Sequence, residues 1–127
     1  DRDQTPGLKA IDTFKELIHL YPQSENSEKA KIHLKEATRR LAQKERYIAD
    51  FYYDRKTYDS ASRRYQKIAE KYPGSDHEEF AYLRWGQAEL MQGLKVSAQK
   101  VFSKYLELFP KGLYVSDVKR SLKQLED

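Results

Sequence analysis

Three stretches of the chain repeat one pattern of side chains. In each, an alanine is followed four positions later by an aromatic residue, three positions after that by a large apolar residue, and five further on by a proline. The three units run from Ala10 to Pro22, from Ala61 to Pro73 and from Ala98 to Pro110. Repeats of this kind are typical of stacked helical hairpins, which build surfaces that hold other proteins and seldom build active sites.

The composition fits a soluble, helix-rich protein. The chain has 127 residues, of which 39% are hydrophobic and 35% charged. No run of about 18 apolar residues occurs, so no membrane-spanning segment is expected. The start, Asp1 to Gln4, is polar and lacks a methionine, so we expect an interior cut rather than a signal peptide. The chain has no cysteine, which excludes disulfides but is compatible with both cytoplasm and periplasm.

Positive charge is concentrated in the middle of the chain. The net charge is +4, and between Arg39 and Lys71 ten lysines and arginines stand against five acidic residues. One interpretation is a solvated helical face. The other is a docking surface for an acidic partner.

Apolar residues recur at three- and four-residue steps along most of the chain, which predicts an all-α fold of about six helices. The first helix ends before Pro22, and Ser24 or Ser27 can cap the next one. That second helix is long, about 28 residues. Its apolar stripe is interrupted at Glu45, where we expect the helix to pass from one neighbour to another.

Later boundaries are marked by turn and capping residues. Ser75 to Glu78 reads as a capping box that starts a helix ending at Gly93. Two further helices are expected over residues 96–109 and 113–125.

The pattern resembles the tetratricopeptide repeat, a 34-residue helical hairpin. With the second and third units aligned on Ala61 and Ala98 as position 20, small residues occupy position 8, aromatic residues position 24 and prolines position 32. Small residues at positions 8 and 20 let the two helices approach, and the aromatic residue fills the gap. Two residues depart from the pattern: Tyr105 is bulky for position 27, and Lys56 replaces the usual glycine at position 15.

The resemblance implies a single array of tetratricopeptide hairpins in a right-handed superhelix over residues 1–127. Its expected parts are the second helix of a truncated repeat (6–22), an extended repeat (25–74), a further repeat (75–110) and a C-terminal capping helix (112–126). The intervals between the alanines are 51 and 37 residues, and the long helix accounts for the first excess.

The uneven spacing and the run Leu41-Ala42-x2-Glu45-x2-Ile48-Ala49-x-Phe51-Tyr52 resemble the C-terminal region of the BamD family, also called YfiO or ComL. The resemblance implies a non-enzymatic scaffold of the β-barrel assembly machinery at the periplasmic face of the outer membrane of a Gram-negative bacterium. Its implied partners are the membrane-proximal POTRA domain of BamA and the accessory lipoproteins. Membrane attachment would come only through a lipid anchor outside this fragment.

Three residues are expected to bind the partner. By matching position, Arg64 corresponds to a family arginine that pairs with an acid on BamA, and Arg55 and Lys67 are added from charge and helical spacing. The apolar side of the truncated N-terminal helix is a further expected contact, through self-association.

The sequence shows no catalytic or cofactor motif. His19, His33 and His77 fit no metal-ligand spacing and no glycine-rich phosphate loop occurs, so no enzyme activity, cofactor or metal is expected. Tyrosines interleaved with arginines fit helix packing or a protein interface better than nucleic-acid binding. Two alternatives stay open: another periplasmic repeat adaptor of the Tol–Pal or cell-division type, and a cytoplasmic adaptor that grips peptide tails.

Overall fold

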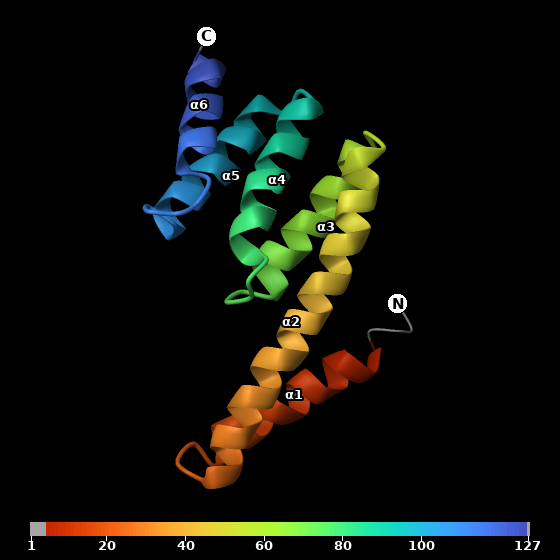
Figure 1. The fold of residues 1–127 in the computed structure, drawn as a ribbon, viewed down its shortest axis with the longest axis vertical. Coiled ribbons are helices and arrows are strands. Elements are labelled where there is room, and N and C mark those ends of the chain that lie inside the picture. Colours follow the sequence, from red (N-terminus) through yellow and green to blue (C-terminus); the bar gives the residue numbers. More distant parts are fainter. Residues whose placement is uncertain (1–4, 127) are drawn as a thin grey trace.

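The computed structural model describes residues 5–126, and within that range every regular element is an α-helix. The helices stack in chain order, each packing on the next, from the N-terminus to the C-terminus (Figure 1). Their bounds are α1 Thr5–Leu20, α2 Glu25–Asp54, α3 Tyr58–Lys71, α4 Glu78–Met91, α5 Lys95–Leu108 and α6 Val115–Glu126. The predicted all-α fold with one long helix is confirmed.

Helix α2 joins two packing environments. Its 30 residues span about 45 Å, and Figure 1 shows α1 beside its first part and α3 beside its last part. On the first part, the ring of Phe14 stacks on His33 with centroids 5.6 Å apart. On the last part, Tyr53 meets Tyr65 of α3 edge to face. Helix α2 therefore forms one hairpin with α1 and another with α3, and α1 and α3 have no large contact with each other.

Of the helix caps predicted from the sequence, one is present in the structure and another is not. Ser24 caps α2, because its Oγ accepts a hydrogen bond from the Ser27 backbone N–H at 3.0 Å. The capping box predicted at Ser75 is wrong, since α4 begins at Glu78 and has no side-chain cap bond. Glu78 instead accepts a hydrogen bond from the Gly74 N–H at 3.0 Å, which holds the turn that precedes the helix.

The close packing expected between positions 8 and 24 of each repeat is present. Gly86 on α4 faces Phe102 on α5, and a Cβ added at Gly86 would lie 2.6 Å from Cδ1 and 2.9 Å from Cζ of that ring. The preceding hairpin places Ala49 and Ala61 with Tyr65, all fully buried. Small residues thus bring the helix pairs together, and one buried ring fills each junction.

The two turns at position 15 share a left-handed backbone. Lys56 has φ 62° and Gly93 has φ 79°. Lysine rarely adopts this conformation because its Cβ approaches the neighbouring carbonyl. The departure noticed in the sequence therefore costs conformational energy without changing the path of the chain.

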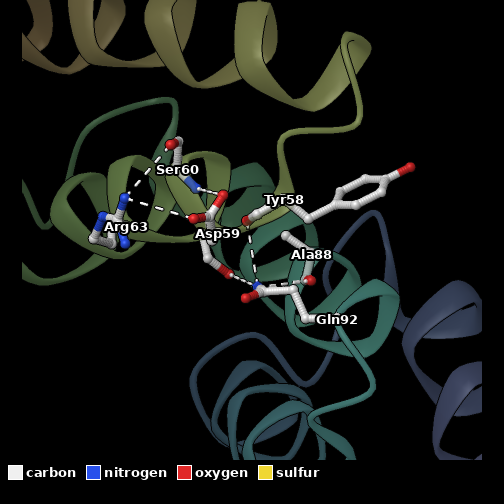
Figure 2. Close-up of polar contacts among 7 residues, drawn as sticks. Tyr58, Asp59, Ser60, Arg63, Ala88 and Gln92 are labelled. Atoms are coloured by element: carbon white, nitrogen blue, oxygen red, sulfur yellow. Dashed lines mark hydrogen bonds and ion pairs between the residues drawn. The ribbon is translucent and has the colours of Figure 1, made fainter.

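Polar side chains tie α3 to the end of α4. The Gln92 Nε2 donates to the carbonyl of Tyr58 at 3.3 Å, to Ser62 Oγ at 3.2 Å and to the carbonyl of Ala88 at 3.0 Å (Figure 2). Figure 2 also shows Arg63 turned to Asp59 and Ser60 of its own helix. The start of α3 is thereby fixed against the repeat that follows.

The bulky side chain of Tyr105 reaches the connection between α5 and α6. Its hydroxyl donates to Glu79 Oε2 at 2.5 Å and accepts from the Tyr114 N–H at 2.8 Å. The same carboxylate oxygen accepts from the Leu113 N–H at 2.6 Å. Burial, and next the hydrogen bond to Glu79, raise the pKa of Tyr105, so it stays protonated and holds the α5–α6 connection.

Candidate docking surface

A buried carboxylate lies at the centre of the surface that contains two of the predicted binding residues. Glu45 of α2 is fully buried. Arg64 Nη1 of α3 bonds to both of its oxygens, at 3.1 and 3.3 Å, and Lys67 Nζ lies 2.8 Å from Oε1. Arg64 and Lys67 are three positions apart, which places them on the same face of α3. We call Glu45, Arg64 and Lys67 the Glu45 cluster.

The cluster holds more positive than negative charge. A carboxylate removed from water needs partners that replace its hydration, and here two cations supply them. The side chains of Arg64 and Lys67 remain 36% and 35% exposed, while that of Glu45 is at 0%. The solvent-facing side of the cluster is therefore cationic, and the Glu45 carboxylate that orients the two cations is buried beneath them.

A second polar layer adjoins the cluster on α2. The Tyr65 hydroxyl donates to Asp50 Oδ1. Burial, with the hydrogen bond to Asp50 next, raises the pKa of Tyr65 well above its usual value. Arg46 lies 3.8 Å over the Phe80 ring and 3.0 Å from Nδ1 of His77. These contacts fix the α2–α3 pair against the start of α4.

The pKa values of two neighbouring side chains, His77 and Tyr72, are shifted. Burial, and then the positive charge of Arg46, lower the pKa of His77, so its ring is neutral and accepts from Arg46 through Nδ1. Burial also raises the pKa of Tyr72, at the end of α3. Neither group adds charge to the surface at neutral pH.

Arg55 lies apart from the Glu45 cluster. It directly follows the last residue of α2, ten residues beyond Glu45, which corresponds to a rise of about 15 Å. Its guanidinium stacks 3.5 Å over the ring of Phe51 and donates to the Phe51 carbonyl at 3.2 Å. Tyr47 and Phe51 are 76% and 43% exposed and precede it at four-residue steps. The structure thus brings two of the three predicted residues together and places the third on a separate aromatic strip.

The role of Glu45 was not predicted from the sequence. A charged residue at an apolar step of a helix was the available signal, because such a residue must find partners if the step is buried. The partners lie on another helix, 19 and 22 positions away. Spacing within one helix could not identify them.

Within residues 5–126 no group of three or more histidine, cysteine or acidic side chains could hold a metal ion. Among these same residues, no helix is both long and apolar enough to cross a membrane.

Comparison with known proteins identifies the family. A family model described as YfiO, outer membrane lipoprotein, matches residues 1–101. The outer membrane protein assembly factor BamD of Vibrio cholerae serotype O1 is 34% identical over 76 residues, which make up 60% of this chain and 32% of that protein. The match therefore spans about a third of that relative's length. The family match over residues 1–101 confirms the expected location at the periplasmic face of the outer membrane in a Gram-negative bacterium. The chain belongs to the YfiO, or BamD, family of outer membrane lipoproteins.

Proposed function

We propose that this chain is a non-enzymatic scaffold in the assembly of outer-membrane proteins, and that the Glu45 cluster docks it on the membrane-proximal POTRA domain of BamA. Family membership supports the general role, as does the name of the Vibrio relative, an assembly factor. The observation that carries the docking site is the pair of partly exposed cations, Arg64 and Lys67, held over a fully buried carboxylate.

Glu45 would prepare Arg64 for a partner rather than compete with it. An arginine has five N–H donors, and only those on Nη1 are directed to Glu45. A carboxylate on the partner can approach the exposed part of the guanidinium and form a charge-assisted bond. Because the side chain is already ordered, binding loses less rotamer entropy than with a free arginine.

A rigid array suits this role. Successive helices pack along the whole described chain, so a partner held at α3 is placed at a set distance from one held at α5 or α6. We propose that the accessory lipoproteins bind elsewhere on the same array. Arg55, on its aromatic strip, would then lie at the rim of the BamA contact and contribute less than Arg64.

The test must separate docking from folding. Arg64→Glu would place a second carboxylate against buried Glu45 and so endanger the fold itself. We therefore compare Glu45→Gln, which keeps the Arg64 cation, with Glu45→Gln/Arg64→Gln, which removes it and leaves an amide pair. Circular dichroism and thermal melting verify that both variants fold.

Isothermal titration calorimetry with the purified POTRA domain then measures the affinity of each variant. We expect Glu45→Gln to bind within about threefold of the unaltered chain and the double variant to bind at least about tenfold more weakly, the loss typical of one partner of an interfacial ion pair. If the two variants bind equally well, the Arg64 charge is not the docking group.

A further inference from the structure

A basic groove lies beside the Glu45 cluster. It encloses about 690 Å³, in the size range of ligand pockets. Helix α2 lies between its two walls, one formed by α1 and the other by the end of α3 and the turn into α4. The groove exists because α1 and α3 pack on successive parts of the same long helix.

Each helix contributes one face to the groove. The lining residues of α2 fall at positions 31, 34, 35, 38 and 39, and those of α1 at positions 8, 11, 12 and 15, both at helical spacing. The apolar part of the lining includes Leu8, Ile11, Leu34 and Tyr72. Leu8 is 43% exposed, so an apolar surface is available at the groove.

The charges of the groove are unbalanced. Six cationic side chains line it against only two acidic ones, Asp12 and Asp76; the cations are Lys15, Lys31, Lys35, Arg39, Lys67 and Lys71. Lys67 pairs with Glu45, and Lys31 pairs with Glu28 at 3.0 Å. The other four form no ion pair with any residue that the structure describes.

On α2, the two cations that form no ion pair with a described residue, Lys35 and Arg39, both line the groove. On the same helix, outside the groove, Lys29 pairs with Glu25 and Arg40 with Glu36, at 3.7 and 2.7 Å. A further polar group lies in the lining: Ser75 Oγ is buried and has no hydrogen-bond partner among the described residues. The groove thus offers positive charge and apolar surface together, with a buried hydroxyl in its lining.

We propose that this groove binds an acidic amphipathic peptide segment of a partner protein. Carboxylates of the segment would pair with the cations at the rim, and its apolar side chains would cover the Leu8 and Leu34 surface. A nucleic acid or another uniform polyanion would satisfy the charges and leave that apolar surface exposed. The mixed lining therefore favours a peptide.

The groove is distinct from the docking site proposed above, although Lys67 contributes to both. Its occupant is recognised by Lys35, Arg39 and Lys71 rather than by Arg64. The Glu45→Gln/Arg64→Gln variant is accordingly expected to bind the peptide within about threefold of the unaltered chain. If the POTRA domain does not dock through Arg64, the proposal for the groove still stands. If the groove does not bind the peptide, the proposed POTRA docking site still stands.

Fluorescence anisotropy provides the test. The probe is a fluorescein-labelled peptide of about 15 residues, with leucines at three- and four-residue spacing and glutamates at the other positions. The groove variant is Lys35→Glu/Lys71→Glu. The matched control, Lys100→Glu/Lys119→Glu, changes net charge equally at exposed sites of α5 and α6. Thermal melting of each variant verifies folding.

We expect the unaltered chain and the control to bind alike, and the groove variant to bind at least about tenfold more weakly, with affinity falling as salt rises. An equally long polyglutamate and a single-stranded oligonucleotide should each bind at least about tenfold more weakly than the amphipathic peptide. Equal losses in groove and control variants, equal binding of either polyanion, or no binding of the peptide would each overturn the proposal.

Discussion

Gly86→Ala tests whether close approach of α4 and α5 holds the last repeat together. Two effects oppose each other at this site. Alanine in a helix is favoured over glycine by about 1 kcal/mol, which would stabilise α4. The added Cβ would lie 2.6 Å from Phe102 Cδ1 and 2.9 Å from Cζ, well inside van der Waals contact.

The clash should outweigh the propensity. The Phe102 ring is fully buried, so it cannot swing into solvent to make room. Overpacking of a core costs about 1–3 kcal/mol, which leaves a net loss of up to about 2 kcal/mol after the gain of about 1 kcal/mol in helix propensity. In a Phe102→Leu background the ring is absent, and the same Gly86→Ala change should be neutral or stabilising.

Urea denaturation followed by far-UV circular dichroism measures these differences. The midpoint should fall for Gly86→Ala with an unchanged m-value. Gln99→Ala, at an exposed site of α5, serves as the control and should change stability by less than about 0.5 kcal/mol. A Gly86→Ala variant more stable than the unaltered chain would refute the packing argument, because helix propensity would then have outweighed the contact.

Three further predictions follow from the turns and buried polar groups. Lys56→Gly should raise the free energy of unfolding by up to about 1 kcal/mol by relieving its left-handed backbone, and Gly93→Lys should lower it by about as much; a loss of stability in Lys56→Gly contradicts this. Tyr105→Phe should cost about 1–3 kcal/mol in urea denaturation, since its buried hydrogen bonds are lost, and a cost below about 0.5 kcal/mol would show that water replaces them. The lowered pKa of His77 means that its neutral form contributes stability fully above about pH 6.5, and that this contribution is lost as the pH falls through the lowered pKa. His77→Gln should therefore flatten the fall in stability on acidification, and an unchanged slope would contradict a lowered pKa of His77.

Local periodicity predicted the fold well, because each helix buries a stripe that its own sequence displays. The small residue Gly86 and the aromatic residue Phe102 also predicted a specific contact between α4 and α5. Capping at Ser75 was harder to predict. The turn at Gly74, with φ 84°, places the Gly74 N–H at the Glu78 carboxylate, so the helix starts three residues later than the serine.

The candidate site was predictable only in part. Arg64 and Lys67 share a face of one helix, so their proximity followed from spacing. Burial of Glu45 depends on where α3 packs along α2, and the groove depends on the separate positions of α1 and α3 on that same helix. Such long-range placements are not encoded in any short window of sequence.

The most direct test of the central proposal is the affinity of the POTRA domain for the Glu45→Gln/Arg64→Gln variant relative to Glu45→Gln alone. Both lack the buried carboxylate, so the comparison isolates the Arg64 cation. We expect the double variant to bind at least about tenfold more weakly. Equal affinities, with both variants folded, would contradict the assignment of the Glu45 cluster as the docking site.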